Sequence, residues 1–119
     1  MAYTVGKIAE LLDIPRSTIR FYDKKGLLPF VGRSPGGIRQ FTENDRRRLE
    51  NILLLRRFGF TIEEIKRYVE LEEEGRSTVS MRLDMLEKRK ESVICEIRSL
   101  SDTLSLIEKT CRQFTDGKH

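Results

Sequence analysis

The chain has 119 residues, with 23 lysines and arginines, 19 aspartates and glutamates and a formal net charge of +4. This length suits one compact domain plus an appendage. No apolar stretch approaches the roughly 18 residues that cross a bilayer, and the N-terminus lacks the pattern of a secretory signal. The sequence therefore predicts a cytoplasmic protein without a membrane anchor. Two cysteines, Cys95 and Cys111, and the terminal His119 are too few for a disulfide framework or a zinc site within one chain.

The positive charge is concentrated in the first third of the chain. Residues 1–48 carry ten Lys/Arg and five Asp/Glu, whereas residues 49–75 carry four and seven, and residues 76–119 carry nine and seven. A basic segment attracts polyanions through electrostatic steering and counterion release, so nucleic acid is the first candidate partner. On charge alone, a solvated basic surface without a ligand is an equally good interpretation.

Residues 4–26 have the pattern of two short helices with a tight turn between them. In 4–12 the apolar residues recur on one helix face, Thr4 can cap the start, and the pattern stops at Asp13. Pro15 suits the entrance to a second helix, and Gly26 suits a left-handed stop after it. Two short helices joined in this way form a helix-turn-helix.

Residues 28–41 have the pattern of a β-hairpin. Two short apolar-rich runs flank the turn sequence Ser34-Pro35-Gly36-Gly37. A hairpin directly after a helix-turn-helix is a wing. Arg33 and Arg39 lie on its two expected strands, where each could meet a phosphate at the edge of a groove. An ordinary surface hairpin is the alternative, which the neighbouring helix-turn-helix disfavours.

Two capping patterns predict further helices that complete a small core. Thr42 to Asp45 starts a helix that Gly59 ends, and Thr61 to Glu64 starts another that Gly75 ends. Three consecutive glutamates, 72–74, lie where the helix dipole disfavours them, and the sequence offers no structural reason for the run.

The last third of the chain has the most regular periodicity. Eleven positions from Val79 to Phe114 follow one another at alternating spacings of four and three residues, and Lys90 is their only charged member. A helix of about 36 residues would be about 54 Å long, more than the first 75 residues can cover. A second copy is the simplest partner, with an expected interface of Leu83, Leu86, Val93, Ile97, Leu100, Leu104, Ile107 and Cys111.

The second helix of a helix-turn-helix enters the major groove with its N-terminal residues toward the bases. Arg16, Ser17 and Arg20 are therefore the candidate base contacts, and residues further along suit phosphates. With the wing included, the expected DNA-binding residues are Arg16, Ser17, Arg20, Tyr22, Lys24, Arg33 and Arg39.

Three segments resemble the mercury-resistance regulator (MerR) family of bacterial transcription factors: TIRFYDKKGLL (18–28), GIRQF (37–41) and FGFTIEEI (58–65). The resemblance covers residues 3 to about 114, and the motifs occur in the right order. It implies an antiparallel coiled-coil dimer that binds a pseudo-palindrome between promoter elements. It also implies bending and untwisting of that DNA, so that RNA polymerase engages both elements.

The same resemblance implies DNA contacts by Arg20, Tyr22 and Arg39. The chain departs from the family pattern at Asp23, where glutamate is usual, and at Ile38 and Phe41, where tyrosines are frequent. These changes are conservative, although the two tyrosine losses remove hydroxyls that could have touched DNA.

The sequence therefore predicts a mainly α fold in three parts. Residues 1–75 form a winged helix-turn-helix DNA-binding domain, 76–114 form a long antiparallel coiled-coil dimerisation helix, and 115–119 form a tail. The expected function is sequence-specific regulation of transcription by a homodimer on promoter DNA. A coiled-coil adaptor that binds protein in place of DNA is the alternative. An enzyme is not expected, because no phosphate loop, internal histidine or nucleophile motif is present.

No cofactor and no separate effector domain are expected. Metal-sensing relatives place a cysteine-bearing loop after the dimer helix, against the start of the partner's helix, and this chain offers Cys111, His119 and Ser77 there. Cu(I) would suit so few ligands better than zinc. The favoured interpretation of Cys111 is a small hydrophobe in the seam, with no metal site.

Overall fold

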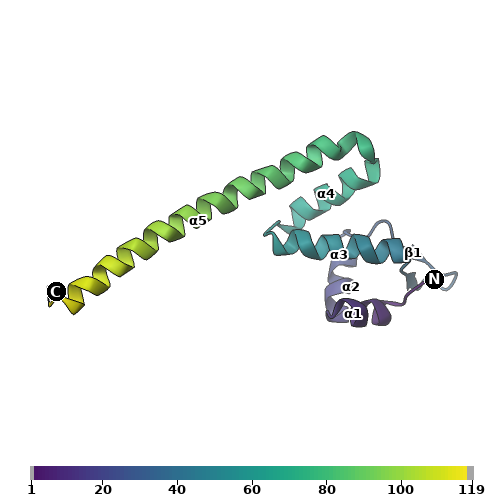
Figure 1. Cartoon of the computed structure of the whole chain (residues 1–119). Helices are drawn as coiled ribbons and strands as arrows, with labels where there is room; N and C mark the ends of the chain where they lie inside the picture. The colour runs from purple at the N-terminus through teal and green to yellow at the C-terminus, as the bar shows by residue number, and fades with distance from the viewer. Residues whose placement is uncertain (1, 118–119) are drawn as a thin grey trace. The chain divides into compact units, whose positions relative to one another are not determined.

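A computed structural model describes residues 2–117 of the chain and is mainly helical (Figure 1). The chain separates into two units, and the boundary between them lies between Arg82 and Leu83. In chain order the elements are α1 (Val5–Leu12), α2 (Arg16–Lys24), β1 (Gly32–Arg33), β2 (Arg39–Gln40), α3 (Glu43–Arg57), α4 (Ile62–Glu74), the 3-10 helix η1 (Arg76–Thr78) and α5 (Val79–Thr115).

Helices α1 and α2 pack on each other and form the predicted helix-turn-helix. The Thr4 side chain accepts a hydrogen bond from the backbone N–H of Lys7, which caps the start of α1. Asp13 ends α1 in the left-handed region, with φ 53°. After α2 the chain turns at Gly26, whose φ of 78° favours glycine. The local signals therefore fix both ends of the motif, as the sequence predicts.

The predicted wing is present, with strands of only two residues each. β1 and β2 are antiparallel, and Gly32 pairs with Gln40 while Arg33 pairs with Arg39. The turn closes through a hydrogen bond of 2.8 Å from the N–H of Gly37 to the carbonyl of Ser34. A hairpin this short is marginal alone, so it depends on contacts with the rest of its unit.

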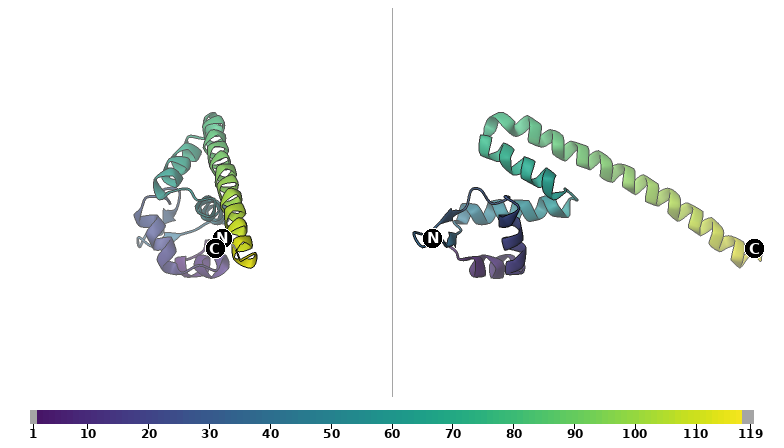
Figure 2. Two further views of the ribbon diagram at one scale, coloured as in Figure 1. Left: turned by 90° about the vertical axis from the view of Figure 1, so that its left-hand side faces the viewer. Right: turned by 180° about the vertical axis from the view of Figure 1, so that it is seen from behind.

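Helices α3 and α4 begin at the predicted capping boxes and lie next to one another (Figure 2). The glutamate run at the end of α4 now has a partial explanation. Glu73 forms an ion pair of 2.6 Å with Arg48 of α3, and the Arg48 guanidinium lies 3.9 Å from the ring centroid of Phe30. Burial raises the pKa of the adjacent Glu72. The run therefore helps to hold α4 against α3.

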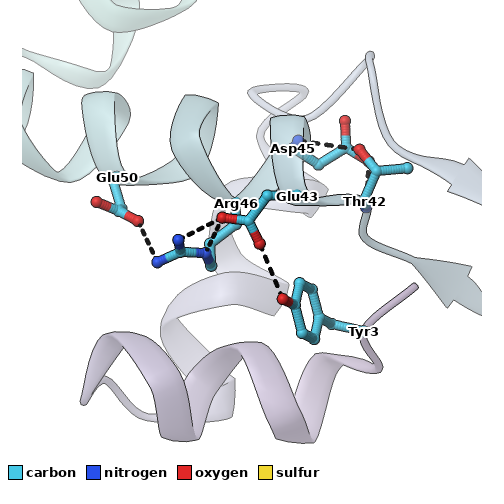
Figure 3. Close-up of polar contacts among 6 residues, drawn as sticks. All are labelled: Tyr3, Thr42, Glu43, Asp45, Arg46 and Glu50. Atoms are coloured by element: carbon cyan, nitrogen blue, oxygen red, sulfur yellow. Dashed lines mark hydrogen bonds and ion pairs between the residues drawn. The ribbon is translucent and has the colours of Figure 1, made fainter. Parts of the chain in front are cut away.

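A polar network joins the chain's N-terminal segment to the start of α3 (Figure 3). Tyr3 pairs through its backbone with Phe41, directly after the wing, and its hydroxyl donates a 2.8 Å hydrogen bond to Glu43. Arg46 donates to Glu43 and also to Glu50, at 2.8 Å. The hydrogen bonds from Arg46 and then Tyr3 lower the pKa of Glu43 to about 2. The network thereby anchors the base of the wing to α3.

The apolar core belongs entirely to the N-terminal unit. Helices α1 to α4 and the segments between them all contribute to it, and Phe41 and Phe60 are its largest fully buried side chains. The other buried apolar residues are Ile8, Ala9, Ile19, Tyr22, Leu27, Leu28, Val31, Leu49, Ile52, Leu55, Ile65, Tyr68, Val69 and Leu71.

The start of α5 is tied to α4 by side-chain hydrogen bonds. Thr78 is buried, and its hydroxyl donates to the carbonyls of Leu71, at 2.5 Å, and Gly75, at 2.8 Å. Arg82 donates to the same Gly75 carbonyl at 3.2 Å. These contacts explain why the N-terminal unit extends to Arg82, beyond the predicted boundary at residue 75.

Helix α5 is one uninterrupted helix of 37 residues, and none of them is buried within the chain. Most large apolar side chains at the predicted seam are more than half exposed, including Ile97 at 61% and Leu100 at 69%, whereas Leu86 and Val93 are half-buried. Lys90 forms an ion pair with Glu87 at 3.3 Å. Despite the length of α5, no helix among residues 2–117 is apolar enough to cross a membrane.

Candidate nucleic-acid interface

Helix α2 presents one polar face and buries the other. Ile19 and Tyr22, three residues apart, point into the core, whereas Arg16, Ser17 and Arg20 are exposed, as is Lys24 one turn after Arg20. This arrangement follows from helical spacing, because residues three or four apart share a face. Within the described part of the chain Arg16, Arg20 and Lys24 form no ion pair, so their charges are available to a polyanion.

The Arg16 side chain lies across the first turn of α1 at Gly6. A Cβ added at Gly6 would meet the Arg16 Nη2 at 2.6 Å and its Cζ at 2.9 Å. A Cβ atom does not lie this close to a non-bonded heavy atom in proteins. The glycine therefore makes room for the guanidinium at the start of the recognition helix.

Tyr22 does not lie with the other predicted DNA-binding residues. Only 6% of its surface is exposed, because it shares the inner face of α2 with Ile19 and packs in the core. The adjacent Phe21 is 45% exposed instead, and the Lys25 ammonium lies 5.6 Å from its ring centroid. The structure thus places Phe21 on the exposed side, which sequence reasoning missed. Its position four residues after Ser17 was the available signal.

On the wing, Arg33 and Ile38 are exposed. Arg33 donates a 2.8 Å hydrogen bond from Nη1 to the carbonyl of Gly37, so its guanidinium lies over the turn. Ile38 follows the same turn and is 64% exposed. An exposed arginine and an exposed apolar side chain at the wing turn suit contact with the sugar and phosphate of a groove edge.

Arg39 lies differently from Arg33. Its Nε donates to Asp23 Oδ2 at 3.1 Å, its Nη2 donates to Asp23 Oδ1 at 2.5 Å, and its Nη1 donates to the backbone carbonyl of Val31. The Arg39 and Asp23 side chains are only 19% and 25% exposed. The Arg39 guanidinium, which sequence analysis assigned to a phosphate, is therefore hydrogen-bonded to groups of the protein itself.

Of the predicted metal ligands, the structure describes Cys111 and Ser77. Cys95 and Cys111 are exposed thiols in α5, and Ser77 is exposed in η1. No group of three or more His, Cys, Asp or Glu side chains among residues 2–117 is arranged to hold a metal ion. His119, the remaining predicted ligand, lies outside the described residues.

Comparison with known proteins identifies the family. The model of the MerR HTH family regulatory protein matches residues 3–72, and that of the MerR DNA-binding region matches residues 46–109. The chain belongs to the MerR family. It is a helix-turn-helix transcription regulator, and the resemblance read from its motifs is confirmed.

Individual MerR relatives match most of the chain. A helix-turn-helix transcriptional regulator of Haemophilus influenzae is 41% identical over 108 residues, which cover 91% of this chain and 80% of the relative. The mercuric resistance operon regulatory protein of Serratia marcescens is 34% identical over 105 residues, which cover 79% of this chain and 73% of that protein.

Solved MerR structures share the fold. The MerR regulator HiNmlR, which lacks the sensor domain and is bound to promoter DNA, is 38% identical to this chain, with a TM-score of 0.75 and coverage of 99% of this chain and 94% of that one. A MerR regulator from Bacillus thuringiensis is 34% identical, with a TM-score of 0.76 and coverage of 95% and 99%. The predicted winged helix-turn-helix with a long C-terminal helix is thereby confirmed.

Proposed function

We propose that this MerR regulator binds promoter DNA sequence-specifically as a homodimer joined through α5, and distorts the operator so that RNA polymerase engages it differently. The observation that carries the proposal is α2, which buries Ile19 and Tyr22 and exposes unpaired basic side chains on its other face. The promoter complex of HiNmlR, a relative without a sensor domain, supports the same role for this chain.

Within α2 the exposed side chains suit different contacts. Arg16 and Arg20 lie in the first half of the helix, which points toward the bases in a helix-turn-helix, and arginine forms bidentate hydrogen bonds with guanine. Phe21 can pack against a thymine methyl group, and Lys24 lies further along, where phosphates are met. We therefore assign sequence preference to the first half of α2 and general affinity to Lys24 and Arg33.

The dimer follows from the exposed seam of α5. In an antiparallel pair with Ile97 opposite the partner's Val93, every seam position from 79 to 111 faces another seam position. Leu83 then lies opposite the partner's Ile107, and Lys90 lies opposite the partner's Leu100. The Lys90 stem can cover apolar surface while its ammonium stays in water. The register thus buries the seam from Val79 to Cys111 without burying a charge.

A two-fold dimer also constrains the operator. Two recognition helices related by the dimer axis must meet major grooves on one side of the duplex, so the half-sites should lie about one helical turn apart, or a multiple of it. Bending and untwisting of the DNA between half-sites would then change how RNA polymerase meets the promoter, as the family resemblance implies.

Loss of Arg20 tests the assignment of the recognition helix. A duplex is first selected by the wild-type protein from a random-sequence pool, and its affinity is measured by fluorescence anisotropy across a range of salt concentrations. Arg20→Ala should weaken binding by about 1–3 kcal/mol and relax the preferred sequence at one position. Arg67→Ala, on the exposed side of α4, is the matched control and should bind like wild type.

The same assay separates the regulator from a protein-binding adaptor. A DNA-binding protein loses affinity steeply as salt rises, because phosphate contacts release counterions. The proposal would be contradicted if the protein bound so weakly that no duplex is enriched from the pool. It would also be contradicted by salt-independent binding that Arg20→Ala leaves unchanged.

A further inference from the structure

We infer that Arg39 is a positioning residue and not a phosphate contact: with Asp23 and the carbonyl of Val31 it locks the wing onto the recognition helix, so that both meet the operator as one rigid surface. We call these three residues the wing lock. The inference rests on the proposed DNA binding and changes the role that sequence analysis gave to Arg39.

The guanidinium of Arg39 has little capacity left for a ligand. Three of the five N–H donors of an arginine are used here, from Nε, Nη1 and Nη2, and two of them form a bidentate pair with the Asp23 carboxylate. Bidentate, charge-assisted pairs are among the stronger hydrogen bonds in proteins, and this one is largely shielded from water. A phosphate would have to displace Asp23 to take the same geometry.

The wing lock spans the three segments that must move together. Asp23 belongs to α2, Arg39 begins β2, and Val31 directly precedes β1 and is buried. The hairpin itself has two-residue strands, which supply little rigidity of their own. The lock therefore fixes both strands to the helix that reads the bases.

The charge pattern supports the same role for Asp23. It is the only acidic residue between Asp13 and Glu43, in a stretch that carries six lysines and arginines. A lone carboxylate on a DNA-facing helix repels phosphates. Pairing with Arg39 neutralises this charge locally, which leaves the neighbouring Lys24 and the wing residue Arg33 to meet the DNA backbone.

Asp23→Asn distinguishes the two roles by the sign of its effect. If Arg39 contacts a phosphate, removal of the carboxylate releases Arg39 and deletes a negative charge, so affinity rises. If the lock positions the wing, affinity for the selected duplex falls by about tenfold, in line with loss of a charged hydrogen bond. Affinity for poly(dI-dC) should not fall, because that binding depends on total charge, which Asp23→Asn makes more positive.

Arg39 variants give a second, independent readout. Loss of a phosphate contact lowers the slope of log affinity against log salt by about 0.9, whereas loss of a positioning residue leaves the slope nearly unchanged. Arg39→Lys sharpens this test, because lysine keeps the charge but cannot form the bidentate pair. We expect Arg39→Lys to lose affinity as much as Arg39→Gln, with no change in slope for either.

Two controls accompany these variants. Glu10→Gln removes the same charge from an exposed site on α1 whose ion pair with Lys7 spans 3.8 Å, and it should bind as well as wild type or slightly better. Asp23→Glu keeps a carboxylate and should retain most of the affinity. Thermal melting of each variant confirms that binding is measured on folded protein.

The outcomes separate this inference from the proposed function. If the wild-type protein enriches no duplex, the proposed function fails. If Arg20→Ala behaves as proposed while Asp23→Asn binds as tightly as wild type or more tightly, only the wing lock is overturned. A drop of about 0.9 in the salt slope for Arg39→Gln, with a normal slope for Arg39→Lys, would also overturn it.

Discussion

The N-terminal unit and α5 differ in the burial of their apolar residues. Of the described residues up to Arg82, sixteen apolar residues are buried within one chain, whereas α5 buries none. The first pattern yields a domain that folds on its own contacts. The second yields a surface that is complete only against another helix, because exposed apolar stripes of this length drive association. The comparison supports the proposed division, in which the first part recognises DNA and the second part joins two copies.

The largest effect should come from charging the seam. Replacing Ile97 and Leu100 with aspartate places uncompensated charges in the paired interface, which costs several kcal/mol. We expect a monomer with lost affinity for the selected duplex and an N-terminal unit that stays folded. Sedimentation measures the oligomeric state, fluorescence anisotropy measures the affinity, and circular dichroism measures whether the variant stays folded.

Leu106→Asp is the matched control for this variant. Leu106 is 66% exposed on the same helix but lies outside the seam. Leu106→Asp should therefore leave the dimer intact. A tight dimer in the Ile97 and Leu100 variant, or dissociation caused by Leu106→Asp, would contradict the seam.

A core truncation should have the next largest effect, on the other side of the comparison. Leu49 in α3 is fully buried, so Leu49→Ala should lower the free energy of unfolding by about 2–5 kcal/mol. Leu54→Ala, on the same helix but 46% exposed, should cost much less. Equal losses of stability in chemical denaturation would contradict a packed interior around Leu49.

The smallest effect concerns pH and should be confined to the N-terminal unit. The pKa of Glu43 is lowered to about 2, from an ordinary 4.5, by its hydrogen bonds with Arg46 and Tyr3. The ionised form is favoured in the folded state, so this contribution is present above pH 4.5 and is lost as pH falls toward 2. Tyr3→Phe removes one of these hydrogen bonds and should raise the pKa of Glu43, which a carboxyl NMR titration measures.

Glu43→Gln serves as the reference for that experiment. Glutamine cannot ionise, so this variant should abolish the part of the acid-dependent loss of stability that comes from Glu43. Tyr3→Phe should only reduce that part. The dimer should respond to neither substitution, because both residues belong to the N-terminal unit. An unchanged Glu43 titration in Tyr3→Phe would contradict the hydrogen-bonded network.

Local signals made much of the fold predictable. Thr4 and the two capping boxes act over three residues, glycine turns act within one residue, and the seam repeats often enough to be read directly. Element types and order therefore followed from the sequence. The two-residue strands did not, since the extent of strand pairing depends on neighbouring contacts.

The candidate site was less predictable, because its decisive contacts join distant residues. Nothing near Arg39 in the sequence indicates its pair with Asp23, which lies sixteen residues away. The contact from Tyr3 to Glu43 spans forty residues and has no local signal either. Phe21 and Tyr22 are adjacent aromatics, and a shift of one residue in helix phase exchanges their roles. The contact of Arg48 with Glu73 likewise depends on how α3 and α4 pack.

Gly6 gives the interface an unusual point of control. The position lies on α1, outside the recognition helix, yet the Arg16 guanidinium occupies the space that any side chain there would need. Residue 6 is therefore a design variable for altered sequence preference: one methyl group on the supporting helix α1 would redirect the arginine at the start of the recognition helix, with no substitution in the recognition helix itself.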